Sequence, residues 1–170
     1  MKKKLFLKAT FLFVLGLALV TSCSKDDDGG DRFAGVPKGE IVPVGERYET
    51  LTGFPEGEGR GSLEESSQVW WKQVQSKIDY HCGGYEDEDL YEEDFYIAFK
   101  PDGLLYAKYG SNGQEFSYYS WEWKDDNKEA ILMEGETFEI RELNDGGIVY
   151  ASRQEQSSDC YAITWEQFSN

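Results

Sequence analysis

The feature that most constrains the fold is a series of short runs, from about residue 63 onward, in which apolar and polar residues alternate. In the run Asp94–Lys100 the apolar positions include Phe95, Ile97 and Phe99, and the run ends at Pro101-Asp102-Gly103, a sequence typical of a tight turn. Almost no stretch shows the periodicity of a helix. We therefore predict eight β-strands, over residues 68–80, 94–100, 104–109, 115–124, 129–134, 137–143, 148–152 and 160–166.

Eight consecutive strands joined by short loops favour an all-β fold in which each strand pairs with the next. We expect residues 62–170 to form one domain, an antiparallel up-and-down eight-stranded barrel. Closure removes the exposed edges that an open sheet would have, and a barrel of this size holds packed side chains or one small ligand. A sandwich of two sheets is the alternative.

The chain begins with a basic segment, Lys2-Lys3-Lys4, which is followed by an apolar run over Phe11–Val20. A helix that spans a bilayer needs about 20 apolar residues, so this run of ten is typical of a secretion signal instead. The run ends in Val20-Thr21-Ser22-Cys23, which resembles the lipobox of bacterial lipoproteins. The resemblance implies that a signal peptide, residues 1–22, is removed and that Cys23 carries a lipid. An ordinary secretion signal followed by an unmodified cysteine is the alternative.

Residues 23–61 are rich in glycine, glutamate and proline, which predicts a lipidated, acidic, flexible tether. The first residues, Ser24-Lys25-Asp26-Asp27-Asp28, resemble a stretch that accompanies surface display in lipoproteins of Bacteroidetes. The resemblance implies an outer-membrane lipoprotein displayed at the cell surface, with attachment at the periplasmic face as the alternative. The expected partner is the lipid membrane itself, through acylated Cys23, because two or more buried acyl chains hold a protein stably.

The chain after the predicted signal carries 33 acidic and 13 basic residues, a formal charge of −20. Such a charge repels nucleic acid and anionic surfaces, so nucleic acid is not an expected partner. The abundance of aromatic residues argues against disorder despite the charge. The glycines match no nucleotide-binding fingerprint and no strand–helix–strand unit surrounds them, so no cofactor is predicted.

The order of motifs between residues 69 and 165 resembles that of the lipocalin-like domains of Bacteroidetes lipoproteins. The motifs that carry the resemblance are Phe99-Lys100-Pro101-Asp102-Gly103, Trp121-Glu122-Trp123, Ile131-Leu132 and Phe138-Glu139-Ile140-Arg141-Glu142-Leu143. The resemblance implies a small β-barrel, and it implies no particular ligand.

Cys82 and Cys160 are the two cysteines that remain beside Cys23. An exported protein meets an oxidising compartment, where disulfides form. Cys82 follows the first predicted strand and Cys160 begins the eighth, and in a closed barrel these strands are antiparallel neighbours. We therefore predict a Cys82–Cys160 disulfide, with two buried thiols as the alternative. Simple alternation fits less well, since it places Cys82 on the face of Tyr80 but Cys160 opposite Tyr161.

Aromatic and apolar stripes on three of the predicted strands are expected to form the barrel core. They are Phe95/Ile97/Phe99, Tyr119/Trp121/Trp123 and Tyr161/Ile163/Trp165. Large rings beside a few polar groups also suit an apolar pocket or stacking on a sugar. Plain core packing, with no ligand, is the simpler interpretation. The candidate ligand-binding residues are Phe99, Tyr119, Trp121, Trp123 and Trp165.

No metal ligand or catalytic residue is predicted. The acidic loop over residues 86–94 offers oxygen ligands of the kind that calcium prefers, but it lacks the spacing of an EF-hand, so a solvated loop is the favoured interpretation. His81 is the only histidine, and a lone histidine builds neither a zinc site nor a catalytic triad by itself.

These observations favour a membrane-anchored, lipocalin-like lipoprotein that binds a small apolar ligand or a glycan and is not an enzyme. One alternative is a protein-interaction module whose barrel interior is filled, and a weaker one is a hydrolase that uses paired carboxylates. An open interior of about several hundred Å³ would favour ligand binding over a filled barrel.

Overall fold

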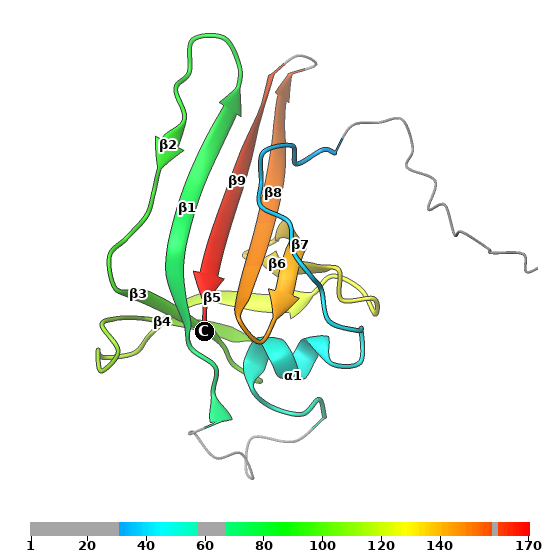
Figure 1. Cartoon of the computed structure of the whole chain (residues 1–170), viewed down its shortest axis with the longest axis vertical. Helices are drawn as coiled ribbons and strands as arrows, with labels where there is room; N and C mark the ends of the chain where they lie inside the picture. Colours follow the sequence, from blue (N-terminus) through cyan, green and yellow to red (C-terminus); the bar gives the residue numbers. More distant parts are fainter. Residues whose placement is uncertain (1–30, 58–66, 158–159) are drawn as a thin grey trace, which may run out of the picture. The chain divides into compact units, whose positions relative to one another are not determined.

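The computed structural model describes residues 31–57, 67–157 and 160–170. Over these residues the chain is nearly all β-structure with one short helix (Figure 1). The elements are α1 (Arg47–Thr52), β1 (Trp71–His81), β2 (Glu88–Asp89), β3 (Phe95–Phe99), β4 (Leu104–Tyr109), β5 (Phe116–Trp123), β6 (Ala130–Met133), β7 (Glu136–Asn144), β8 (Gly147–Ser157) and β9 (Cys160–Ser169). No helix within the described ranges has the length and apolarity that a membrane crossing requires.

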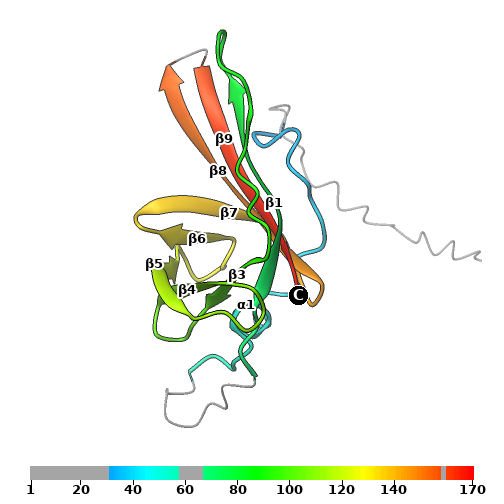
Figure 2. The same ribbon diagram turned by 90° about the vertical axis from the view of Figure 1, so that its left-hand side faces the viewer.

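The strands form one antiparallel sheet that closes on itself. From β3 to β9 each strand pairs with the next, and β1 pairs with both β3 and β9 to complete a ring of eight. The short strand β2 pairs with β1 and takes no other part in the ring. The prediction of an all-β, antiparallel, eight-stranded barrel is therefore confirmed. Strands β1, β8 and β9 have 11, 11 and 10 residues, and Figure 2 shows them extending beyond the curled sheet of shorter strands.

Tight turns join the shorter strands, as the turn signals in the sequence predict. Gly103, between β3 and β4, has a φ of 78°. Between β6 and β7, Glu134 and Gly135 have φ values of 50° and 83°, which is the left-handed backbone that two-residue hairpin turns favour at both positions. This turn brings the Glu134 carboxylate to β5, where it accepts hydrogen bonds from the backbone N–H and the hydroxyl of Ser120.

The main core lies inside the barrel and is built from alternating side chains of its strands. Trp121 is 6 % exposed and Trp123 packs against the same core, whereas Glu122 between them is exposed, as alternation predicts. Helix α1 contributes Leu51, whose backbone carbonyl accepts a hydrogen bond of 3.0 Å from the indole N–H of Trp71.

A second apolar cluster lies on the opposite face of β8 and β9. The register pairs Tyr150 with Glu166 and Ala151 with Trp165, so neighbouring residues of each strand face opposite sides of the sheet. Tyr150 belongs to the main core, whereas Ala151 and Trp165 pack with Phe33 in the second cluster. The prediction that the stripe containing Trp165 lies inside the barrel is therefore wrong. These rings are buried because an N-terminal segment covers them from outside.

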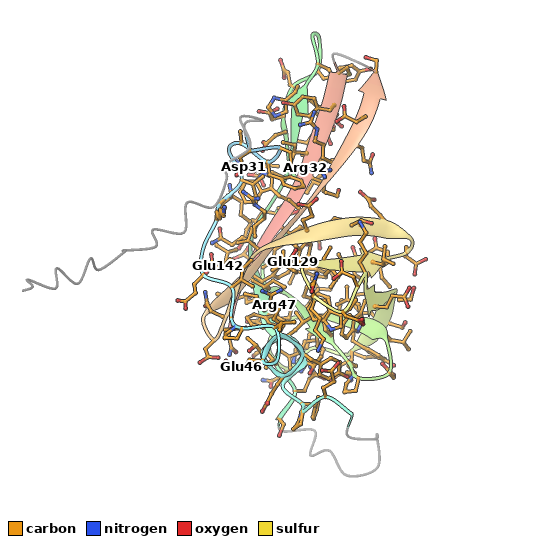
Figure 3. The ribbon with its side chains drawn as sticks, turned by 90° about the vertical axis from the view of Figure 1, so that its right-hand side faces the viewer. Asp31, Arg32, Glu46, Arg47, Glu129 and Glu142 are labelled. Atoms are coloured by element: carbon orange, nitrogen blue, oxygen red, sulfur yellow. A yellow bond between two sulfur atoms is a disulfide. The ribbon has the colours of Figure 1, made fainter. Side chains whose placement is uncertain are left out.

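The tether predicted over residues 23–61 is wrong for residues 31–57, because these residues pack against the barrel. Figure 3 shows the segment passing from Asp31 and Arg32, beside the long strands, to Arg47 at helix α1. Its apolar residues Phe33, Val36, Leu51 and Phe54 are buried. Its backbone also pairs with β7, where the N–H of Val42 donates to the carbonyl of Leu143 at 2.9 Å. Residues 1–22 and Cys23 lie outside the described residues.

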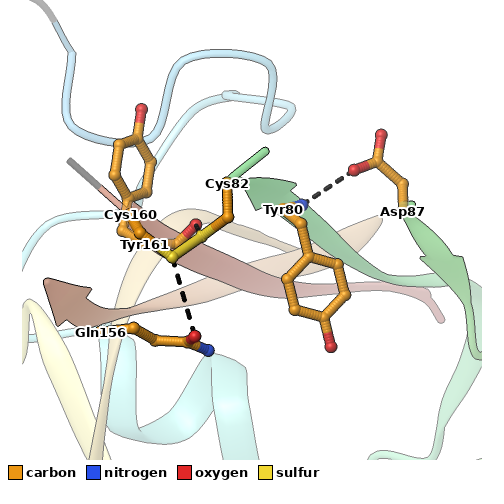
Figure 4. The surroundings of a disulfide bond; sticks show 6 residues. All are labelled: Tyr80, Cys82, Asp87, Gln156, Cys160 and Tyr161. Carbon is orange, nitrogen blue, oxygen red and sulfur yellow. Dashed lines mark hydrogen bonds between the residues drawn. A yellow bond between two sulfur atoms is a disulfide. The ribbon is translucent and has the colours of Figure 1, made fainter. Parts of the chain in front are cut away.

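The predicted Cys82–Cys160 disulfide is confirmed, and Figure 4 shows its surroundings. The two Cα atoms are 4.6 Å apart, because β1 and β9 remain paired as far as His81 and Tyr161. The inner and outer faces of β9 are exchanged relative to the prediction, and this exchange also removes the mismatch expected from alternation. Since Tyr161 faces outward with the second cluster, Cys160 beside it shares the inner face with Tyr80.

Candidate ligand-binding cavity

The barrel encloses a cavity of about 280 Å³. Seven of its strands or the turns beside them contribute lining residues, from β3 through to β9. The lining residues are Ile97, Leu105, Tyr118, Tyr119, Met133, Glu134, Glu136, Phe138, Tyr150, Thr164 and Glu166. The volume lies just below the range of about 300–1,000 Å³ that is usual for small-molecule sites, so the cavity suits a small ligand.

The cavity has an apolar, closed side and an aromatic, open side. Ile97 and Leu105 are each 1 % exposed and form part of the closed side. Tyr118 and Tyr119 are 43 % and 39 % exposed, so they mark the opening to solvent. The rest of the barrel interior is filled by the main core, to which helix α1 contributes Leu51. The interior is therefore partly filled and partly open.

An irregularity in the sheet brings both tyrosines to the cavity. Adjacent residues of a regular strand face opposite sides, so Tyr118 and Tyr119 should not both line one pocket. The register between β4 and β5 shifts by one residue at this point, where Leu105 pairs with Tyr119 but Tyr106 pairs with Ser117. Such a bulge re-aims a side chain, and it leaves the two tyrosine rings 4.1 Å apart at the opening.

Glu166 and Tyr150 form a hydrogen-bonded pair inside the cavity. The phenol of Tyr150 on β8 donates to Oε2 of Glu166 on β9 at 2.9 Å. Loss of hydration raises the pKa of Glu166 to about 7 from an ordinary value of 4.5, and the nearby charge of Glu92 acts in the same direction. Burial likewise raises the pKa of Tyr150 well above its ordinary value, so this hydroxyl stays protonated.

Two further carboxylates line the cavity near the β6–β7 turn. The Oε1 atom of Glu134 accepts hydrogen bonds from Ser120, and Oε1 of Glu136 accepts them from the Ser152 hydroxyl at 2.6 Å and the Gln154 amide at 2.8 Å. These bonds hold both carboxylates in place without neutralising them. Neither carboxylate, nor that of Glu166, forms an ion pair with a basic residue in the part of the chain that the structure describes.

The structure distributes the five predicted ligand-binding residues over three environments. Tyr119 lines the cavity. Phe99 and Trp121 belong to the main core, with their rings 5.3 Å apart, and Trp123 packs against that core. Trp165 lies in the second cluster, on the outside of the barrel, where its indole N–H donates to Asp79 at 2.7 Å.

Sequence reasoning missed the polar residues of the cavity, above all Glu166 and Tyr150. The chain has so many carboxylates that no single one stands out by type. In β9, Phe168 continues the face of Thr164 and Glu166, but the other face carries Tyr161 and Trp165, so ring position alone does not identify the inner face.

The predicted acidic loop packs along β1. Asp87 accepts a hydrogen bond from the backbone N–H of Tyr80, and the N–H of Glu92 donates to the side chain of Gln73 at 2.7 Å. Among the described residues no group of acidic, histidine or cysteine side chains is arranged to hold a metal ion. His81 stacks on Tyr161 with ring centroids 4.4 Å apart, at the end of the barrel that carries the disulfide.

Comparisons with protein-family models, curated proteins and solved structures find no match to this chain.

Proposed function

We propose that the barrel binds one small ligand in the cavity between β3 and β9. The observation that carries this proposal is the cavity itself, a space of about 280 Å³ within an otherwise packed interior. Its apolar side and its few convergent polar groups are the usual composition of a small-molecule site. A barrel that served only as an interaction module would need no such opening, so the cavity favours binding over a filled interior. The protein acts as a non-enzymatic carrier or receptor in this proposal.

The cavity proposal predicts a bound small molecule in full-length protein purified from its own host. Native mass spectrometry should detect a complex heavier than the polypeptide and its modifications. In Tyr119→Ala the occupancy should fall several-fold, by roughly the factor expected when one aromatic contact at the opening is lost. Tyr119 is 39 % exposed, so the change should leave the fold intact.

A matched control is Tyr85→Ala, which removes an exposed tyrosine that does not line the cavity. Its occupancy should equal that of the wild type. Ligand-free protein in all three preparations, or equal losses in both variants, would count against the cavity as the binding site.

The protein is further proposed to be a lipoprotein, attached to the outer membrane through Cys23 and displayed at the cell surface. The sequence supports this, through the short apolar run that ends at Cys23 and the resemblance to lipocalin-like lipoproteins of Bacteroidetes. The Cys82–Cys160 disulfide is consistent with it, because disulfides persist in oxidising compartments outside the cytoplasm.

Lipidation at Cys23 predicts that a palmitate analogue supplied to the cells will label the wild-type protein but not Cys23→Ser. The serine hydroxyl replaces the only thiol at this site, so the diacylglyceryl group has no sulfur to join. Cys82→Ser is the control and should remain labelled. Equal labelling of the wild type and Cys23→Ser would contradict the anchor.

A further inference from the structure

The polar side chains that line the cavity all carry a carboxylate or a hydroxyl group. The carboxylates are those of Glu134, Glu136 and Glu166, and the hydroxyls are those of Tyr118, Tyr119, Tyr150 and Thr164. Lysine, arginine and histidine do not occur among these lining residues. An anionic ligand would therefore meet like charges, whereas a cationic ligand would meet complementary ones.

The described part of the protein leaves these carboxylates without a positive partner. Their hydrogen bonds reach a single oxygen in each case, Oε1 of Glu134 and Glu136 and Oε2 of Glu166. The second oxygen of each accepts no hydrogen bond from a described residue. Glu166 is the most deeply buried of the three, whereas Glu134 is exposed, and a buried carboxylate in this condition is unfavourable unless it is protonated or paired with a cation. A ligand that brings a positive charge would supply the missing partner.

The aromatic rings of the cavity are also free of cations, in contrast to rings elsewhere in the barrel. On other faces of the barrel Lys108 Nζ lies 3.8 Å from the ring centre of Trp70, and Arg153 Cζ lies 3.5 Å from that of Tyr161. The rings that line the cavity, those of Tyr118, Tyr119, Phe138 and Tyr150, have no such cation among the described residues. Rings and carboxylates around one small space are the groups that recognise ammonium ions.

We infer that the ligand of this cavity carries a protonated amine on a small apolar body. The ammonium group contacts the Glu166 carboxylate and the tyrosine rings, and the apolar body packs against Ile97 and Leu105. This inference rests on the proposed function, since it names the chemical class of the ligand that the cavity binds. It distinguishes an amine from a neutral sugar or a fatty acid, which would fit a barrel cavity without using its charge.

Three probes of matched size test the charge of the ligand. They are 2-phenylethylamine, 2-phenylethanol and 3-phenylpropionate, which share a phenyl ring and differ in the charge of the end group. Calorimetric titration of the full-length protein at pH 8 should give the tightest binding for the amine, about tenfold tighter than for the alcohol, because a charged hydrogen bond is stronger than a neutral one. The carboxylate should bind more weakly than the alcohol.

Glu166→Gln tests whether this carboxylate is the partner. The glutamine keeps the shape of the side chain and an oxygen that can accept the Tyr150 hydroxyl, but it removes the charge. Affinity for the amine should fall about tenfold while affinity for the alcohol stays unchanged, and the retained alcohol binding shows that the variant is folded. Glu122→Gln, an exposed carboxylate of β5 outside the cavity, is the matched control and should alter neither affinity.

The outcomes separate the inference from the proposed function. Two results would overturn the inference of an amine ligand while leaving a neutral ligand in the same cavity. One is equal affinity for the amine and the alcohol, and the other is an equal loss of amine affinity in Glu166→Gln and Glu122→Gln. Tighter binding of the carboxylate would overturn it as well. If none of the three probes binds and the protein from its own host carries no small molecule, the cavity itself is not a binding site.

Discussion

Replacing Trp121 with alanine should lower the free energy of unfolding by about 3–5 kcal/mol, the range for removing a well-packed indole from a core. Trp121 is 6 % exposed, and its N–H donates to the backbone carbonyl of Lys100 at 3.1 Å. Its ring meets those of Phe99 and Trp123 edge-on, with centroids 5.3 and 5.9 Å apart. The substitution removes these contacts and leaves a void. Urea-induced unfolding, followed by far-UV circular dichroism, measures the change.

The neighbouring variant Glu122→Ala provides the control. Glu122 is exposed on the outer face of β5, so its removal should change the free energy of unfolding by no more than about 0.5 kcal/mol. A larger loss for Glu122→Ala than for Trp121→Ala would mean that the register of β5 is shifted by one residue. Such a slip would exchange the two faces of that strand and would remove Tyr119 from the cavity.

The barrel could be predicted from sequence because its determinants are local. Alternation in runs such as Phe95/Ile97/Phe99 identifies a strand and its inner face, and turn residues such as Gly103 mark where the strand ends. Barrel closure follows when the first and last strands are the only unpaired edges. The disulfide could be placed for the same reason, since closure brings Cys82 and Cys160 to one end of the barrel.

The inner face of β9 could not be predicted because it depends on a distant segment. Both faces of this strand are buried, one by the barrel core at Phe168 and the other by Phe33 of the N-terminal segment. Alternation therefore identifies a strand there but does not say which side is inside. The segment itself reads as a tether because its apolar residues are scattered among glycine, proline and charged residues, and their burial is a tertiary effect.

The residues of the candidate site could likewise be predicted only where local alternation identifies them. Tyr119 could be predicted, as an aromatic residue of an evident strand. Tyr118 could not, because the one-residue shift between β4 and β5 leaves no mark in the sequence that distinguishes it from regular alternation. Glu166 could not either, since its role follows from the orientation of β9.

Glu166→Gln should stabilise the protein at pH 8 and have little effect at pH 5. The folded-state pKa of Glu166, about 7, lies above the ordinary value of 4.5, so the folded protein holds a proton that the unfolded chain has lost between these two values. The stability associated with this group is present below pH 4.5 and is lost as the pH rises through 7. A shift of this size corresponds to about 3 kcal/mol of unfolding free energy.

The measurement is the difference in unfolding free energy between the wild type and Glu166→Gln at pH 5 and at pH 8. Groups that do not interact with Glu166 titrate alike in both proteins and cancel, so the difference should move by about 3 kcal/mol in favour of the variant. Glu122→Gln should stay within about 0.5 kcal/mol of the wild type at both values. A difference that does not change with pH would show that Glu166 is hydrated in the folded state. If the difference appears in ligand-free protein and shrinks when 2-phenylethylamine is added at one concentration to both proteins, the amine stabilises the wild type more than the variant, and the buried charge and the amine are energetically linked through this one carboxylate.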